Sequence, residues 1–239
     1  PAASTIKIPI LLLTLQMLDN GELLWNEAIK IEQNLKGGGA GWMAYEPIGS
    51  LFPIHEIATE MIRVSDNTAA NLLIKRLGGI QAINNKLENL GLENTKLNNL
   101  LPDLEGTNVT SSRDLVLAIS LIESGEILTQ KSRDLFREIM STSKSNNLIP
   151  KGILRGIGDN SQERLDSKLL IKGYRVYNKT GDIGITYGDT GIIQLPDSKR
   201  AIAAFLVKGP FNDSRSPELI REMTKAIIQV LNPKTLLPL

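Results

Sequence analysis

Residues 4–18 read STIKIPILLLTLQML, and this stretch decides how the first half of the chain folds. Its apolar side chains lie on every side of a helical projection, which is typical of a helix buried in a core. Pro9 would fall in the second turn and cannot donate the hydrogen bond that the Thr5 carbonyl needs, so we expect a distortion there. The stretch predicts a buried helix that begins at Ser4 and carries Lys7 one turn further on, on the same face.

The residues that follow predict a mainly helical region. The glycine-rich stretch 37–53 is typical of a loop. Apolar periodicity then predicts a series of helices, the second of which ends at Gly78-Gly79. These helices cover residues 54–63, 68–77, 80–90, 111–123 and 131–140.

The pattern changes after Gly173. Three strand-like runs follow, separated by turn residues: YRVYNKT (174–180), ITYGDTGIIQL (185–195) and KRAIAAFLVKG (199–209). A last helix is predicted from Ser216-Pro217, a cap and first-turn pair, to about residue 231. This order predicts an α+β fold, with a mainly helical region over residues 1–168 and an antiparallel sheet plus a C-terminal helix over residues 169–239.

Composition excludes several classes of function. The net charge of +1 gives no reason to expect nucleic acid or an anionic membrane as a partner. The longest apolar run, residues 8–13, is far shorter than the roughly 20 residues of a membrane span, and no signal peptide is visible. The chain has no cysteine and one histidine, His55, so we expect no Cys/His metal site, no cofactor and no cysteine nucleophile. A hydrolase of this composition needs a base other than imidazole, and lysine is the obvious candidate.

Three short motifs occur where catalytic groups could meet. They are Ser4-Thr5-Ile6-Lys7 at the start of the buried helix, Ser65-Asp66-Asn67 before a helix, and Lys179-Thr180-Gly181 on a strand. Each has an ordinary explanation: a chance match, a helix cap and a strand end with a turn glycine. A second Ser-x-x-Lys match, Ser141 to Lys144, lies in a polar run that we interpret as a loop. The occurrence of all three motifs in this order favours a shared catalytic function over three separate ordinary explanations.

The first motif has a chemical rationale. A helix start offers free backbone N–H groups to a developing oxyanion beside Ser4. The amine of Lys7 can act as a base only if its pKa falls from about 10.4, and burial and a second cation both lower it. Lys179 could be that cation.

In series, these motifs resemble the signature set of class A β-lactamases and penicillin-binding proteins. The longer strings ASTIKIPI (3–10), VSDNTAANLL (64–73) and NKTGDIG (178–184) agree with it, and the similarity covers nearly the whole chain. The resemblance implies a helical region packed beside a helix-flanked antiparallel sheet, with the site in the cleft between them. The family's sheet has five strands, two of which precede the nucleophile helix, so we expect those strands to be absent from this chain.

The resemblance also implies a role for each residue. Ser4 would attack a carbonyl, with Lys7 as proton acceptor, and Ser65 would pass a proton to the leaving nitrogen. Asn67 would hydrogen-bond the substrate amide, and Thr180 would contact the substrate carboxylate. Lys179 would supply positive charge, and Gly181 would adjoin the substrate. The backbone N–H groups of Ser4 and Asp182 would form the oxyanion hole. These residues are Ser4, Lys7, Ser65, Asn67, Lys179, Thr180, Gly181 and Asp182.

The chain departs from the family after the second motif. Matching TKLNN (95–99) to the family puts Leu101 where class A enzymes hold the glutamate that hydrolyses the acyl-enzyme. Asp103 and Glu105 could substitute for it, although the more ordinary interpretation is that both are solvated loop carboxylates. Asp189 stands where some class A enzymes keep an arginine, so carboxylate binding could fall to Arg175. The segment 150–173 is longer than in typical members and has no assigned role.

Three functions remain open from the sequence. The chain could be a β-lactamase-like hydrolase with impaired deacylation, a D-Ala-D-Ala peptidase or transpeptidase, or a β-lactam-binding sensor or scaffold without turnover. The expected partner is a small β-lactam or a peptidoglycan stem peptide. The resemblance implies a periplasmic, secreted or cell-envelope location.

Overall fold

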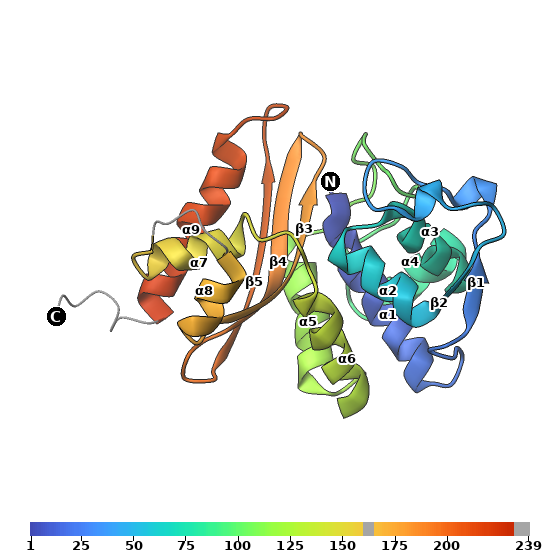
Figure 1. Cartoon of the computed structure of the whole chain (residues 1–239), viewed down its shortest axis with the longest axis horizontal. Helices are drawn as coiled ribbons and strands as arrows, with labels where there is room; N and C mark the ends of the chain where they lie inside the picture. The colour runs from blue at the N-terminus through green and yellow to red at the C-terminus, as the bar shows by residue number, and fades with distance from the viewer. Residues whose placement is uncertain (160–164, 232–239) are drawn as a thin grey trace.

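The computed structural model describes residues 1–159 and 165–231, and its elements form layers around one sheet. Figure 1 shows the sheet β3-β4-β5 in the middle, helices α7, α8 and α9 on one side of it and the other helices on the opposite side. This is the α+β arrangement that the sequence predicts. The helices before the sheet are α1 (Lys7–Asp19), α2 (Ile54–Arg63), α3 (Asn67–Arg76), α4 (Gly79–Asn89), α5 (Ser112–Ser124) and α6 (Gln130–Ser141).

The distortion expected at Pro9 takes the form of a 3-10 start to the first helix. The chain is 3-10 over η1 (Ala3–Ile6) and becomes α-helical only at Lys7. Pro9 therefore lies in the first turn of the α-helical part, a position at which proline is tolerated better than in a helix interior. Nearly every side chain of α1 is buried, as its all-round apolar sequence predicts.

The loop predicted over 37–53 contains more structure than expected. It includes the short 3-10 helix η3 (Met43–Tyr45), and η2 (Gln33–Leu35) precedes it. A two-stranded sheet joins β1 (Ala28–Lys30) to β2 (Leu51–Pro53). Three-residue strands carry too few positions for an alternating pattern to be visible in the sequence.

The predicted meander is present as an antiparallel sheet. Its strands are β3 (Arg175–Asp182), β4 (Thr186–Gln194) and β5 (Arg200–Lys208), in the order β3-β4-β5. The register pairs Lys179 with Thr190 and Thr180 with Asp189. Since β3 pairs only with β4 among the described strands, it is an edge strand.

The far face of the sheet is covered by α7 (Ile149–Gly156), α8 (Leu165–Ile171) and α9 (Arg215–Leu231). Helix α7 lies close against α9. At Gly152 a Cβ atom would lie 2.5 Å from the Thr224 side chain, so this approach requires glycine. These helices share a second apolar cluster with the sheet, and that cluster begins at Leu148. The division predicted between residues 168 and 169 stays a prediction.

A search of the described residues finds no helix with the length and apolar character that a membrane crossing requires.

Candidate active site

Two serines from separate motifs are associated with left-handed backbone conformations. Ser65 adopts one itself, and Ser4 directly follows a residue that does. Ser4 is in η1 and follows Ala3, whose φ is 45°. Ser65 has a φ of 60° in the short connection between α2 and α3. Residues other than glycine rarely adopt this conformation, and when they do it is often at a functional site.

The amine of Lys7 joins these two serines. Its Nζ atom lies 3.2 Å from Ser4 Oγ and 3.1 Å from Ser65 Oγ. It also donates to the Ser65 carbonyl at 2.6 Å and to Asn67 Oδ1 at 2.8 Å. The Lys7 side chain is fully buried. Four of the predicted site residues therefore meet at one buried nitrogen atom.

The surroundings of Lys7 favour the neutral amine. Burial lowers the pKa of Lys7 well below its ordinary value, and the charge of nearby Lys179 lowers it further, against a smaller opposing effect of Asp66. A neutral amine within hydrogen-bond reach of a hydroxyl group can accept its proton.

Asp66 fixes the loop that carries the second motif. Its side chain caps α3 by accepting a hydrogen bond from Ala69 N, as the cap interpretation of the sequence predicts. Its other oxygen accepts from the backbone N–H groups of Trp42 and Met43. These hydrogen bonds of Asp66 hold the loop that places Ser65 and Asn67 beside Lys7.

The third motif packs directly on the segment that carries Ser4. A Cβ atom on Gly181 would lie 2.8 Å from Ser4 N, so only glycine allows β3 to approach η1 this closely. Lys179 is buried and its Nζ atom donates to the Thr180 carbonyl at 2.7 Å. Lys179 is thus linked to Lys7 by charge, whereas Ser4 and Ser65 are linked to Lys7 by hydrogen bonds. Asp182 is exposed at the end of β3, and its side chain accepts from Gly184 N.

Leu101 is held from both sides by one asparagine. Its N–H donates to Asn71 Oδ1 at 2.8 Å, and its carbonyl accepts from Asn71 Nδ2 at 2.6 Å. The Leu101 carbonyl and the Asn67 side chain both border Gly37, where a Cβ atom would meet them at 2.2 and 3.1 Å. The backbone of residue 101 is therefore fixed beside the second motif.

The two carboxylates offered as substitutes for a loop glutamate have other surroundings. Asp103 is buried and accepts from Thr107 Oγ1 and Asn108 N, which closes the loop on itself. Glu105 is exposed and has no side-chain hydrogen bond to a described residue. Neither is hydrogen-bonded to the group around Lys7.

The sequence did not indicate which residues hold Leu101 and Asp189 in place. Leu101 is held by Asn71. Asn71 is one helical turn after Asn67, a spacing that places both on one face of α3 and could have drawn attention to it. Asp189 does not take up the role of an arginine in the cleft. It is buried and accepts from Asn178 Nδ2 at 2.8 Å and from Ile149 N at 2.9 Å. It thereby ties the start of α7 to β3.

The other residues singled out in the sequence lie apart from the group around Lys7. His55 is exposed on α2, with its ring near Trp25. Trp42 donates to Glu60 and Tyr45 is largely exposed. Ser141 of the second Ser-x-x-Lys match donates to the Glu138 carbonyl at the end of α6.

Comparison with known proteins gives the family. A model described as the beta-lactamase enzyme family matches residues 1–231. The chain belongs to this family. A β-lactamase of Bacillus licheniformis is 26% identical over 230 residues, which cover 92% of this chain and 71% of that protein. The extended-spectrum β-lactamase PER-1 of Pseudomonas aeruginosa is 26% identical over 235 residues, with the same two coverages.

Several solved structures share the fold. PBP-A has a TM-score of 0.88 and 39% identity, covering 98% of this chain and 82% of its own. A PBP-A variant with one leucine replaced by glutamate, solved as an acyl-enzyme complex with penicillin G, gives the same values. A β-lactamase of Sphaerobacter thermophilus has a TM-score of 0.79 and 25% identity, covering 100% of this chain and 84% of its own. The chain is a serine hydrolase of a family that acts on β-lactam amide bonds, with the α+β fold of β-lactamases and transpeptidases.

Proposed function

We propose that this protein opens β-lactam rings by acylation of Ser4 and releases the product slowly. The observation that carries the proposal is the buried Lys7 amine, which lies within hydrogen-bond distance of both Ser4 Oγ and Ser65 Oγ. A base between a nucleophile and a proton donor is the arrangement that acyl transfer requires.

The proposed reaction begins with proton transfer from Ser4 Oγ to the neutral Lys7 amine. The oxygen attacks the β-lactam carbonyl, and the N–H groups of Ser4 and Asp182 receive the developing negative charge. The C–N bond of the ring then breaks, and its nitrogen takes a proton from Ser65, which regains one from Lys7. Lys179 and Thr180 bind the substrate carboxylate, while Asn67 binds the substrate amide.

Slow deacylation follows from the residues near position 101. A leucine side chain cannot activate water. Asp103 is engaged with Thr107 and Asn108, and Glu105 is exposed. Loss of a positioned base typically costs about 10²–10⁴-fold in rate. We therefore expect the penicillin G adduct to form readily and to persist.

Replacing Leu101 by glutamate tests this explanation directly. The Asn71 clamp holds the backbone of residue 101, so the new carboxylate would start where the leucine side chain starts. We expect deacylation to speed up by about 10²–10⁴-fold with little change in acylation. Intact-mass spectrometry of the isolated penicillin G adduct over time measures its lifetime.

Leu101→Gln is the matched control, because the glutamine side chain has the shape of glutamate and is also polar. Its amide cannot act as a base. Its adduct should live as long as that of the unmodified protein. Formation of the adduct in each variant shows that the variant is folded. A Leu101→Glu adduct with an unchanged lifetime would mean that residue 101 does not limit deacylation.

The charge of Lys179 sets a second expectation, for pH dependence. Burial lowers the pKa of Lys179 to about 8, and the Asp189 carboxylate opposes this fall. Burial raises the pKa of Asp189 itself to about 6, so Asp189 is mostly ionised at neutral pH. Above a pH of about 8, Lys179 loses the charge that attracts the substrate carboxylate, and the acylation rate constant should fall.

Asp189→Asn should move this fall to lower pH, because the carboxylate that supports the protonated Lys179 is gone. Stopped-flow acylation with a chromogenic cephalosporin across pH 5–10 gives both profiles. Superimposable alkaline limbs for the two proteins would rule out the proposed coupling.

Leu101 also favours a second candidate, a D-Ala-D-Ala peptidase or transpeptidase that acts on stem peptides. Such an enzyme uses the same acylation chemistry and is trapped by a β-lactam whose adduct is not hydrolysed. Similarity to PBP-A supports this candidate. Release of D-Ala from a stem-peptide mimic would establish it, whereas a stable penicillin adduct without such release indicates a sensor. A peptidase of this kind would act in the cell envelope or outside the cell.

A further inference from the structure

The segment 37–41 borders Asn67, the residue to which the proposed reaction assigns the substrate amide. Its sequence is Gly-Gly-Gly-Ala-Gly. The Gly38 carbonyl accepts a hydrogen bond from Asn67 Nδ2 at 2.8 Å, and the Ala40 carbonyl accepts one from Asn67 N at 3.2 Å. The backbone of the segment is therefore held against the second motif, while residues 37–39 present no side chain to the site.

The fold requires glycine at two of these three positions. A Cβ atom on Gly37 would lie 2.2 Å from the Leu101 carbonyl oxygen. Gly39 has a φ of 87°, a backbone conformation that residues with a side chain rarely adopt. An ordinary side chain at either position would strain the folded protein.

Gly38 differs from its neighbours, because the fold does not require glycine there. Its φ lies outside the left-handed range, and the residue is exposed. A Cβ atom on Gly38 would have no described atom within 4 Å beyond its own chain neighbours. Glycine at such a position lowers stability, because it gives the unfolded chain more conformational freedom. The missing side chain at residue 38 therefore needs a reason other than packing.

The contacts of Asn67 supply that reason. Its Nδ2 atom carries two N–H groups, and one of them donates to the Gly38 carbonyl. The hydrogen bonds among the described residues leave the other N–H group for the carbonyl oxygen of a substrate amide. A Cβ atom on Gly39 would lie 3.9 Å from the same nitrogen atom. A group attached to the substrate carbonyl would therefore pass beside residues 38 and 39, where no side chain obstructs it.

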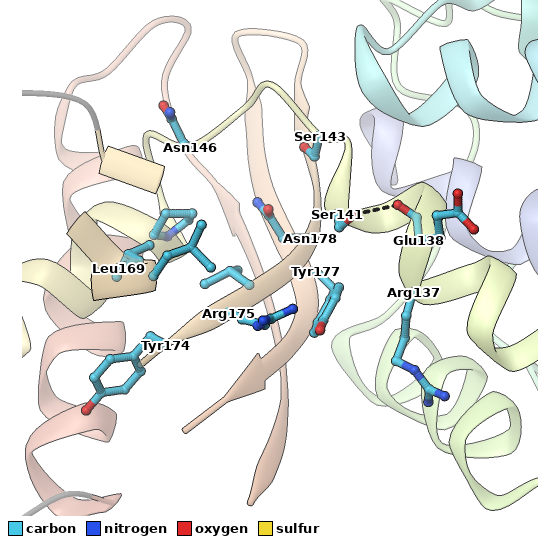
Figure 2. A pocket seen from close by; sticks show the side chains of 13 residues that line it. Arg137, Glu138, Ser141, Ser143, Asn146, Leu169, Tyr174, Arg175, Tyr177 and Asn178 are labelled. Atoms are coloured by element: carbon cyan, nitrogen blue, oxygen red, sulfur yellow. Dashed lines mark hydrogen bonds between the residues drawn. The ribbon is translucent and has the colours of Figure 1, made fainter. Parts of the chain in front are cut away.

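The pocket of about 450 Å³ in Figure 2 does not provide this space. It lies between α6, α8 and β3, and neither Asn67 nor Lys7 lines it. The segment 142–148 crosses the edge of β3 at this point, where the Ser145 carbonyl accepts from Asn178 Nδ2 at 3.1 Å. A substrate held at Asn67 therefore has room for its acyl group along the glycine segment.

We propose that the bare backbone of Gly38 and Gly39 forms the acyl-side wall of the site and admits substrates with a bulky, branched group on the amide carbonyl that Asn67 binds. This inference rests on the proposed acylation of Ser4 and on the proposed contact between Asn67 and the substrate amide. Gly38 determines specificity by what it leaves open. A side chain at this position would exclude large acyl groups and still leave room for small ones.

The test compares two penicillins that share the ring system and the amide and differ in the acyl group. The small one is 6-acetamidopenicillanic acid, which has a methyl group on the amide carbonyl. The large one is nafcillin, which has an ethoxynaphthyl group there. Intact-mass spectrometry after rapid mixing gives the acylation rate constant for each. In the unmodified protein we expect nafcillin to react at least as fast as the acetamido compound, because nothing obstructs the larger group.

Gly38→Leu places a side chain in this space. We expect the ratio of the nafcillin rate constant to the acetamido rate constant to fall at least about tenfold, because a clash with the larger group discriminates between the two substrates. Thermal stability should stay the same or rise, since the fold does not require glycine at this position.

Gly39→Asn is a second variant that obstructs the same space from the next residue. Asparagine adopts positive φ more readily than most residues, and its side chain would begin beside Asn67 Nδ2. The ratio should fall in this variant too. Ala226→Leu is the matched control, because it adds a similar bulk at an exposed position of α9, on the far side of the sheet, and should retain the full ratio.

A nafcillin rate constant less than a tenth of the acetamido rate constant in the unmodified protein overturns the inference. It is also overturned if the ratio stays within threefold of the unmodified value in both glycine variants, or falls equally in Ala226→Leu. In each of these cases acylation of Ser4 by the acetamido compound leaves the proposed function intact. Failure of both penicillins to acylate Ser4 in folded, unmodified protein overturns the proposed function itself.

Discussion

Ser4→Ala is expected to abolish the covalent adduct with penicillin G. Alanine has no oxygen to bond to the carbonyl carbon. Among the described serines, only Ser65 also has a side chain hydrogen-bonded to Lys7, and its proposed role is proton transfer. Intact-mass spectrometry after mixing with penicillin G should show the adduct mass for the unmodified protein and the unchanged mass for the variant.

Ser141→Ala is the matched control for this experiment, since Ser141 begins the second Ser-x-x-Lys match in the sequence. Its hydroxyl donates to Glu138 O and is exposed, so acylation should be unaffected. A covalent adduct on folded Ser4→Ala protein would show that the nucleophile is a different residue.

Lys7→Met is expected to slow acylation by about 10²–10⁴-fold, because it removes the general base and retains a long unbranched side chain. The pKa of Lys7 is lowered by burial and by Lys179, so the unmodified protein has neutral amine available at moderate pH. Acylation should therefore rise with pH on the acidic side of the profile as Lys7 loses its proton. In Lys7→Met this acidic limb should disappear along with most of the rate.

Rapid-mixing measurements of the acylation rate constant at several pH values check both statements. Lys131→Met removes one positive charge from an exposed position at the start of α6 and serves as the control. A rate within threefold of the unmodified protein, in Lys7→Met of equal thermal stability, would assign the base to another group.

The sequence predicted the parts of this protein that depend on long, regular patterns. The all-round apolar stretch 4–18 is a buried helix, and the three alternating runs after Gly173 form the antiparallel meander. The spacing of Ser4 and Lys7 placed both groups on one face of a helix start. The position of the third motif, by contrast, depends on Gly181 approaching the Ser4 backbone, a contact between segments far apart in the chain.

Features that depend on such long-range contacts could not be read from local patterns. Helix α7 has Pro150 in its first turn but no capping side chain, and Gly152 and Gly156 let it approach α9. Asp189 stands where some class A enzymes keep an arginine, and the sequence does not tell which face of β4 it occupies. Asn178 and the start of α7 provide its partners, and they come from two different segments.

The left-handed backbone conformations of Ala3 and Ser65 lower the stability of the folded protein. Each departs from the backbone angles that its side chain prefers, at a cost of roughly 1–3 kcal/mol. Selection for thermal robustness alone would favour glycine at both places, since glycine adopts such angles without penalty. Natural chains retain costs of this kind where catalysis depends on them. The molecule therefore gives up part of its folding free energy to keep two hydroxyl groups aimed at one amine.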